Sequence, residues 1–96
     1  MNKFNLKLSN SFKKSLKIVR KRKLDLNKLY IIVKKLVDNE QLDDKYRDHQ
    51  LTNSKHFINC RECHIEPDWL LIYKKNDSEL VLLLIETGSH SDLFNK

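Results

Sequence analysis

Three histidines and one aspartate in the second half of the chain, His49, His64, Asp68 and His90, carry side chains suited to proton transfer. Imidazole, with an unperturbed pKa of about 6.5, can serve as acid or base near neutral pH. RNA cleavage without a metal needs one group to take a proton from the ribose 2′-hydroxyl and another to give one to the leaving 5′-oxygen. A single histidine in a strand is more often structural, but several beside a carboxylate in one small basic chain favour acid–base catalysis on RNA.

Three further residues could bind such a substrate rather than react with it. Arg61 is the candidate for stabilising the charge of a phosphorane, although its spacing from His64 in a strand puts it on the opposite face. Phe94 or Trp69 could stack on an exposed base, and Trp69 is as readily a packing residue.

The turn that follows His64 decides whether this residue meets Asp68. A two-residue turn at Glu66-Pro67 places His64 opposite Trp69 and leaves Asp68 on the other face of the hairpin. A three-residue loop brings His64 and Asp68 to one side. The sequence leaves both arrangements open.

The string CRECH, residues 60–64, matches the pattern of covalent haem attachment. We reject that reading because no export signal is visible and the only methionine is the initiator. Cys60, Cys63 and His64, completed by His49 or His90, could instead hold zinc as a Cys₂His₂ set. The odd spacing of the two cysteines sends them to opposite faces of a strand, which argues against zinc and makes Cys63 a core residue.

Positive charge is concentrated at the N-terminal end of the chain. The net charge is +6, yet residues 1–35 hold twelve Lys and Arg with one acid, Asp25, which is a net charge of +11. Residues 36–96 carry a net charge of −5. This asymmetry exceeds what solubility requires and predicts an anionic partner such as a nucleic acid. Neither a helix-turn-helix signature nor zinc-finger spacing is visible, so no groove-reading DNA motif is predicted.

Length and composition predict one folded domain over residues 1–96. The 96 residues are 40% hydrophobic with one Gly and one Pro, which is too apolar for a disordered chain and too short for two cores. The longest apolar run, Leu80–Ile85, is far shorter than the roughly 20 residues that span a bilayer. We therefore expect a cytoplasmic protein without membrane contact.

Hydrophobic periodicity predicts the elements of the N-terminal half. Alternation over residues 4–8 indicates a half-buried strand, and the Ser and Asn residues after it offer a helix cap. Two amphipathic helices follow within residues 11–23 and 24–40, the second capped by Asp25 or Asn27. Two successive helices of this kind form a hairpin over one face of a sheet.

The second half reads mainly as strands. Residues 40–56 are polar and predict a long loop with one helical turn or a short strand. Residues 60–65, 69–74 and 79–87 predict three strands, the last closed by Gly88 and followed by a short tail. The order predicts an α+β fold, in which an N-terminal strand and a two-helix hairpin pack on a small antiparallel β-sheet.

Three strings, DHQLT at 48–52, RECHIEPDWLLIYK at 61–74 and TGSHSDLF at 87–94, closely resemble the YafQ-type toxins of the RelE superfamily. The resemblance implies a RelE-like fold and a ribosome-dependent endoribonuclease that cuts mRNA in the ribosomal A site, with no metal or cofactor. It also implies a cognate antitoxin, DinJ- or RelB-like, that neutralises the toxin and carries the contact with operator DNA.

By position, the resemblance carries catalytic roles to His49, His64, Asp68 and His90, followed by the aromatic Phe94. It implies that His90 is the general acid. His49, His64 and Asp68 then supply the base and its orientation, in roles that the resemblance leaves open.

Three positions depart from the family pattern. Glu86 stands where Arg usually precedes T-G-[ST]-H, and a carboxylate cannot stabilise a phosphorane, so the chain is expected to be slower or to rely on Arg61 or nearby Lys. Asn53 stands where Gly is common, and Asn tolerates the left-handed conformation, so a turn is expected there. Cys60 stands where an aromatic is common, which makes the match to haem attachment accidental.

Two other functions stay open at this point. A non-catalytic RNA- or ribosome-binding module of the same fold would explain the basic half and Glu86. A small metal-binding protein would explain Cys60, Cys63 and His64.

Overall fold

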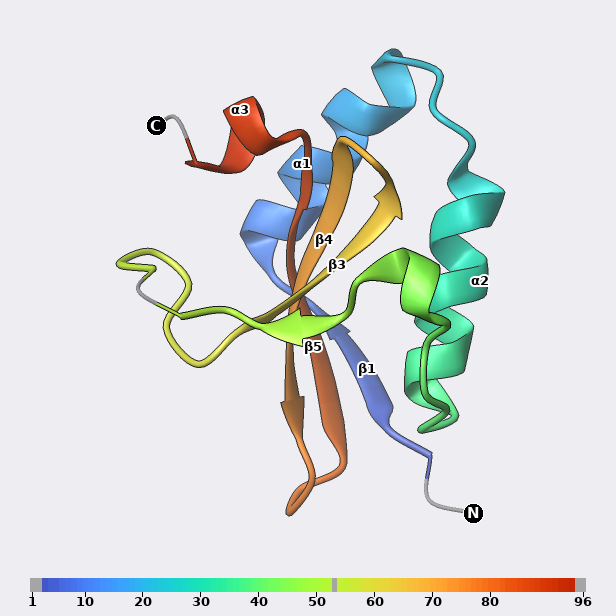
Figure 1. Ribbon diagram of the computed structural model, residues 1–96, viewed down its shortest axis with the longest axis vertical. Helices are drawn as coiled ribbons and strands as arrows, with labels where there is room; N and C mark the ends of the chain where they lie inside the picture. Colours follow the sequence, from blue (N-terminus) through green and yellow to red (C-terminus); the bar gives the residue numbers. More distant parts are fainter. Residues whose placement is uncertain (1–2, 53, 95–96) are drawn as a thin grey trace.

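The computed structural model describes residues 3–52 and 54–94 (Figure 1). Asn53, where the sequence predicts a turn, lies outside the described residues. The elements follow one another in the order β1 (Asn5–Leu8), α1 (Asn10–Lys21), α2 (Leu26–Val37), a short 3₁₀ helix η1 (Asp44–Tyr46), β2 (His49–Gln50), β3 (Arg61–Glu66), β4 (Trp69–Asn76), β5 (Val81–Gly88) and α3 (His90–Phe94).

The strands form one sheet in the order β1-β5-β4-β3-β2. β1 lies parallel to β5, with Asn5 opposite Val81, and the other neighbouring strands are antiparallel. The parallel pair is possible because the long connection between β1 and β5 can return the chain in the same direction. The predicted α+β architecture is confirmed, and the N-terminal strand forms one edge of the sheet.

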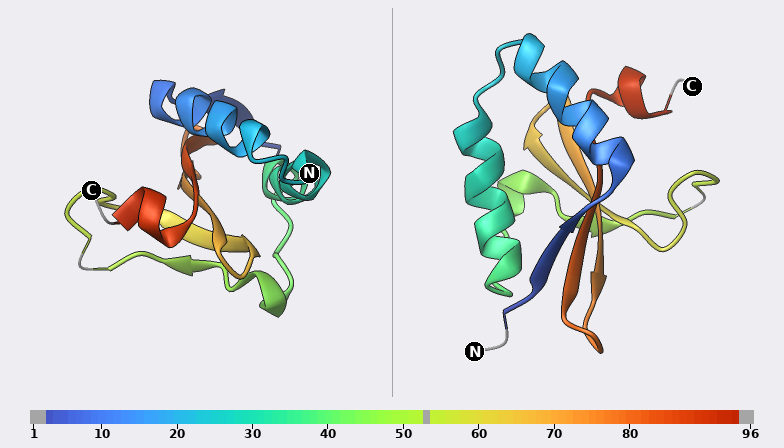
Figure 2. Two further views of the ribbon diagram at one scale, coloured as in Figure 1. Left: turned by 90° about the horizontal axis from the view of Figure 1, so that it is seen from above. Right: turned by 180° about the vertical axis from the view of Figure 1, so that it is seen from behind.

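Both predicted helices are present and begin at predicted caps. The Ser9 hydroxyl accepts a hydrogen bond from the backbone of Phe12 at 2.9 Å, and the Asp25 carboxylate accepts one from Asn27 at 3.0 Å. Figure 2 shows α1 and α2 beside the twisted sheet. Among the described residues no helix is long and apolar enough to cross a bilayer.

A first hydrophobic cluster joins both helices to one face of the sheet, as predicted. The helices contribute Phe12, Val19, Leu29, Ile32 and Leu36, and the strands contribute Cys63, Ile65, Trp69, Leu71, Tyr73, Leu82 and Leu84. β1 departs from its predicted pattern, because Leu6 and Leu8 are exposed and Phe4, just before the strand, is the residue that joins the cluster.

A second hydrophobic cluster covers the opposite face of the sheet. Leu70 and Ile72 of β4 pack there against Phe57 and Cys60 from the loop before β3 and against Leu93 of α3. The C-terminal segment, read from the sequence as a short tail, is therefore a helix docked on the sheet. This docking brings His90, its first residue, to the face that the long helices leave open.

The two cysteines belong to different clusters and do not form a disulfide. Cys60 is buried in the second cluster and Cys63 in the first. The two cysteines therefore lie on opposite faces of the sheet, as their odd spacing predicted. Burial raises the pKa of both thiols, which disfavours the thiolate that zinc requires. The metal-binding and haem readings of Cys60, Cys63 and His64 are wrong because no single site can collect the three side chains.

The hairpin of β3 and β4 differs from both arrangements predicted for it. Its two-residue turn is Pro67-Asp68, one residue later than expected, and a bulge between His64 and Glu66 shifts the pairing so that His64 lies opposite Leu70. Asp68 therefore lies in the turn itself, where its side chain is not confined to one face of the sheet.

Candidate active site

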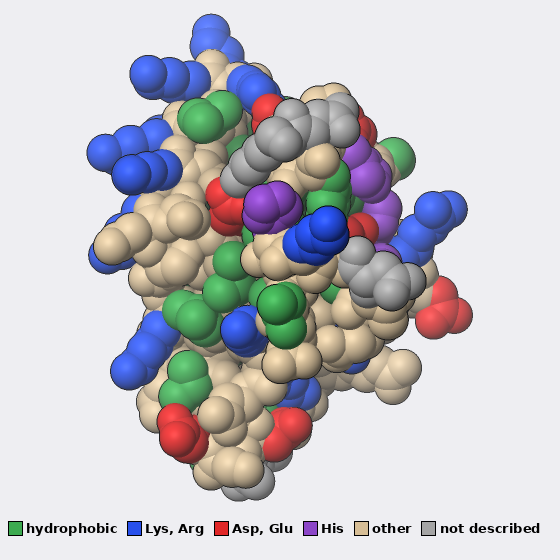
Figure 3. Space-filling model, turned by 90° about the vertical axis from the view of Figure 1, so that its left-hand side faces the viewer, with side chains coloured by type: hydrophobic (Ala, Val, Ile, Leu, Met, Phe, Trp, Pro, Cys, Tyr) green, Lys and Arg blue, Asp and Glu red, His purple; other side chains and the backbone are tan. Residues whose placement is uncertain are grey.

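Three of the predicted histidines form a row across one face of the sheet. His49 on β2 is followed by His64 on β3 at a ring-centroid distance of 6.5 Å, and His64 by His90 on α3 at 5.7 Å. Paired residues of neighbouring strands share a face, and His64 pairs with Leu70 of the second cluster, so the row lies on the α3 side of the sheet. The space-filling view shows several histidine side chains close together toward one side of the molecule and one apart from them, with many Lys and Arg side chains along the opposite edge (Figure 3).

A buried carboxylate that sequence reasoning missed connects two of these imidazoles. Glu62 is 5% exposed, and its Oε1 lies 3.1 Å from His64 Nε2 and 4.0 Å from His49 Nε2. Pairing of His49 with Glu62 places both on the face of His64. The sequence did contain a signal for Glu62, because Glu62 and His64 are two residues apart in a predicted strand and such residues point to the same face.

His90 is held by Asp68 through two contacts. Asp68 Oδ1 accepts a hydrogen bond from the backbone N–H of His90 at 3.0 Å and lies 2.9 Å from the imidazole Nδ1. The backbone N–H and then the imidazole hold the pKa of Asp68 below its ordinary value, so this carboxylate is ionised at neutral pH. An ionised carboxylate can only accept, which places a proton on Nδ1 and leaves Nε2 as the atom that can face a substrate.

The other two imidazoles are oriented by backbone carbonyls. His49 Nδ1 lies 2.6 Å from the carbonyl oxygen of Arg47, and His64 Nδ1 lies 3.3 Å from that of Pro67. Both contacts direct Nε2 toward Glu62. The result is a group of three imidazoles and two carboxylates that can hold and move protons over a short distance.

Phe94 lies beside this group with part of its ring exposed. The ring is 6.2 Å from that of His90 and packs edge-on against Phe57 at 5.6 Å, and Phe94 is 39% exposed. An aromatic ring held in this way can stack on a nucleobase.

Arg61 does not join the row of histidines. It pairs with Tyr73, which faces the helices, and its guanidinium donates from Nε to the Tyr73 hydroxyl at 3.3 Å and lies 3.2 Å from Asp48 Oδ2. The Tyr73 hydroxyl also donates to Asp48. The prediction that Arg61 contacts a phosphate in this site is corrected, because Arg61 instead ties Asp48, the neighbour of His49, to the central strands.

Trp69 is a packing residue. It is 2% exposed, and its indole Nε1 donates to Thr87 Oγ1 at 2.9 Å, whose hydroxyl in turn donates to the carbonyl of Leu70 at 2.7 Å. Because the indole is almost fully buried, neither face of its ring is accessible for stacking on a nucleobase. Of the two roles considered for Trp69, the structure supports packing, and the prediction that Trp69 stacks on a base is corrected.

An open cleft of about 510 Å³ borders His64. Its walls come from α2, from η1 and from the turn of β3 and β4, and its lining consists of Lys28, Ile31, Lys45, Tyr46, Arg47, His64, Ile65, Glu66 and Pro67. Lys28 is paired with Glu66 at 3.0 Å. Lys45 and Arg47 are the other two cations that line this cleft. Glu86, by contrast, lines a smaller hollow with Lys14 of α1 and Asp92 of α3.

The row also contains donors that a metal could use. Glu62, His64 and His90 each offer one ligand atom, and these atoms lie within 4.8 Å of one another. One carboxylate oxygen and two imidazole nitrogens form a donor set that suits zinc or another transition metal.

The fold and the site define a class: a small basic α+β protein with acid–base groups on one face of its sheet. Residues 4–95 match the model of the YafQ family, described as the bacterial toxin of type II toxin–antitoxin systems, and the chain belongs to this family. The mRNA interferase toxin YafQ of Escherichia coli K12 is 38% identical over 90 residues, which cover 93% of this chain and 94% of the relative.

Solved structures of the family share the fold. YafQ in the E. coli DinJ–YafQ toxin–antitoxin complex has a TM-score of 0.85 at 36% identity, covering 96% of this chain and 98% of that one. The metal-bound toxin from Helicobacter pylori has a TM-score of 0.87 at 41% identity, covering 95% and 99% of the two chains. The predicted RelE-like fold and family are confirmed.

The role of Trp69 can be tested with a smaller aromatic residue that cannot donate its hydrogen bond. Trp69→Phe should lower the free energy of unfolding by about 1 to 3 kcal/mol, since it loses a buried hydrogen bond and part of a packed ring. RNA binding by the folded variant should be unchanged. Urea denaturation and titration with a labelled RNA measure the two quantities, and RNA affinity lost without loss of stability would restore the stacking role.

Proposed function

We propose that this chain is the mRNA interferase toxin of a toxin–antitoxin pair, a ribosome-dependent endoribonuclease that cleaves mRNA in the ribosomal A site. The observation that carries the proposal is the row of His49, His64 and His90, in which each imidazole is oriented by an oxygen acceptor. Relatives named as mRNA interferases support the same activity.

Cleavage proceeds by attack of the ribose 2′-oxygen on the adjacent phosphorus. The O2′–P bond forms and the P–O5′ bond breaks, which yields a 2′,3′-cyclic phosphate and a 5′-hydroxyl. His49 takes the 2′-hydroxyl proton on Nε2, and Glu62, 4.0 Å away, stabilises the imidazolium that results. His64 has an oxygen acceptor at each ring nitrogen, so it holds Glu62 in place and does not itself accept the proton. His90, oriented by Asp68, donates a proton from Nε2 to the leaving 5′-oxygen. No step needs a metal.

The phosphorane charge is stabilised by cations of the cleft beside His64. Arg61 is engaged by Asp48 and Tyr73, and Glu86 replaces the family Arg, so neither supplies this charge. Arg47 and Lys45 line the cleft next to the imidazole. Phe94 holds the target nucleotide by stacking on its base.

Attachment to ribosomal and messenger RNA comes from the basic N-terminal half. The Lys and Arg side chains of α1 are exposed, and Figure 3 shows many Lys and Arg side chains along one edge of the molecule. Such contacts release counterions, so attachment weakens as the salt concentration rises.

A DinJ- or RelB-like antitoxin neutralises the protein, as DinJ assembles with YafQ in E. coli. Operator DNA is contacted only through the complex with that antitoxin. Action on ribosome-bound mRNA places the protein in the cytoplasm. A non-catalytic RNA- or ribosome-binding module of the same fold is the alternative, favoured by Glu86 in place of Arg.

The endoribonuclease can be tested with translating ribosomes. Wild-type protein should generate new mRNA ends, and His90→Ala should lower the cleavage rate at least a hundredfold, because general acid catalysis is worth about 10²–10⁴ in rate. His56→Ala, at an exposed histidine outside the row, is the matched control and should cleave as the wild type does. Primer extension on the mRNA locates the ends.

Intact mRNA with the wild type would contradict the proposal. Ribosome binding that persists without cleavage would establish the non-catalytic module. Expression of the wild type should halt growth, and co-expression of its antitoxin should restore it.

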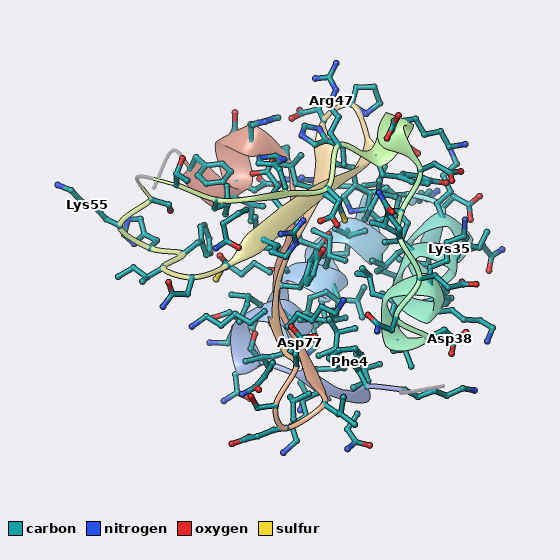
Figure 4. All side chains as sticks on the ribbon, turned by 60° about the horizontal axis from the view of Figure 1, so that its bottom comes forward. Phe4, Lys35, Asp38, Arg47, Lys55 and Asp77 are labelled. Atoms are coloured by element: carbon teal, nitrogen blue, oxygen red, sulfur yellow. The ribbon has the colours of Figure 1, made fainter. Side chains whose placement is uncertain are left out.

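Arg47 can be tested against a cation outside the cleft. Arg47→Gln should lower the maximal cleavage rate at least tenfold, because removing one donor to a developing anion typically costs about 10²–10³ where that donor is fully engaged. Lys35→Gln, on α2 and well separated from Arg47 in Figure 4, should leave the maximal rate unchanged. Equal effects of the two substitutions on that rate would remove Arg47 from the proposed mechanism.

The metal donors of the site give a further test, since the H. pylori relative is a metal-bound toxin. We expect EDTA to leave cleavage unchanged and added Zn²⁺ to inhibit it, because a cation on Glu62, His64 and His90 would occupy the lone pairs needed for proton transfer. Cleavage assays with a Zn²⁺ titration measure both effects. Loss of cleavage in EDTA, restored by Zn²⁺, would show that the reaction uses a metal.

A further inference from the structure

The short helix α3 carries both His90 and Phe94, and its position depends on contacts with other parts of the chain. It spans five residues, and Leu93 is its one buried side chain. Helices this short are not stable alone. Leu93 anchors α3 on the second cluster, Phe94 packs against Phe57 at the end of the helix, and Asp68 accepts a hydrogen bond from the backbone N–H of His90.

A further anchor of α3 is an arginine from the N-terminal half of the chain. Arg22, the C-cap of α1, forms a bidentate ion pair with Asp92. The Nη1–Oδ2 distance is 2.5 Å and the Nη2–Oδ1 distance is 3.0 Å. A guanidinium that pairs with a carboxylate through two parallel hydrogen bonds has a fixed orientation toward it as well as a fixed distance. Arg22 lowers the pKa of Asp92, and Asp92 raises that of Arg22.

Asp92 also fixes the start of α3. Its Oδ2 accepts a hydrogen bond from Ser89 N at 2.9 Å, and its own N–H donates to Ser89 Oγ at 3.1 Å. Gly88, at φ 156°, leaves room for this carboxylate, because a Cβ there would lie 2.9 Å from Oδ2. One carboxylate therefore joins α1 to the first turn of α3, where His90 lies.

We propose that Arg22 and Asp92 are positioning residues that hold the imidazole of His90 and the ring of Phe94 in the geometry needed for cleavage. The inference rests on the proposed function, and it changes the role of Arg22. The sequence groups Arg22 with the other cations of residues 1–35, for which an anionic partner is expected, but in the structure both terminal nitrogens of its guanidinium are paired with Asp92.

Exposure of the pair separates positioning from overall stability. The side chains of Arg22 and Asp92 are 47% and 31% exposed, and ion pairs this exposed contribute little to the free energy of unfolding. Breaking the pair should therefore leave the protein folded while α3 loses its fixed orientation. Misplacement of a catalytic group by about 1 Å can cost as much as a hundredfold in rate.

The experiment compares Arg22→Gln, Arg22→Lys and Asp92→Asn in the ribosome cleavage assay. Both Arg22→Gln and Asp92→Asn should lower the maximal rate about tenfold, and the double variant should lose no more than about twofold beyond either one, because the two side chains form one unit. Arg22→Lys keeps the positive charge but cannot form the bidentate pair, so its maximal rate should be close to that of Arg22→Gln. Asp77→Asn, in the turn of β4 and β5 at the far end of the sheet from α3, is the matched control and should cleave normally (Figure 1).

The substitution at Asp92 separates positioning from attachment to RNA. Loss of a negative charge strengthens binding to an anion, so a slower Asp92→Asn variant cannot be explained by weaker attachment. The proposal is overturned by the following combination of results. Arg22→Gln raises the toxin concentration that gives half the maximal rate but leaves the maximal rate unchanged, and Arg22→Lys returns that concentration to the wild-type value. Asp92→Asn cleaves as the wild type does.

An NMR measurement keeps this test independent of the endoribonuclease activity. Backbone order parameters of residues 90–94 should fall below about 0.6 in Arg22→Gln and Asp92→Asn while those of β4 stay near about 0.85. Unchanged order in α3 would overturn the proposal even if the chain cleaves RNA. Reduced order in α3 would support it even if the wild type proves inactive.

Discussion

The alternation of side chains along β3 and β4, with a hydrophobic cluster on each face of the sheet, is the constraint on which the rest of the structure depends. Cys63 and Leu71 face the long helices, so Glu62 and His64 face α3. A slip of one residue would expose both clusters, which makes the register costly to change. The central imidazole and its buried carboxylate therefore occupy a fixed position, while His49 and His90 reach it from short elements at the edge and end of the sheet.

Charged side chains have two separate uses in this molecule. Arg61 and Arg22 form ion pairs with Asp48 and Asp92, each next to or within two residues of a histidine of the row. Most Lys and Arg side chains of α1 lie exposed instead. The net charge of the N-terminal half thus overstates the charge free to meet an anion, because some of it is neutralised by acids that come later in the chain.

Periodicity and capping were sufficient to predict most of the fold. Ser9 and Asp25 begin their helices as expected, and the odd spacing of Cys60 and Cys63 correctly placed them apart. The helix at the C-terminus was missed because a five-residue segment has almost no local signal and forms only where Leu93 docks. The bulge after His64 was also missed, since register shifts depend on how both strands pack.

By itself, the sequence determined the family, the α+β architecture and the residue types available for proton transfer, because strings and periods are local properties of the chain. Only the tertiary structure decided which residues meet. Pairing across strands brought Glu62 close to two imidazoles and placed Arg61 and Trp69 on the opposite face of the sheet, although both stand in the same string as His64. The contact of Arg22 with Asp92 joins residues 70 positions apart, and no local pattern encodes a separation of that length.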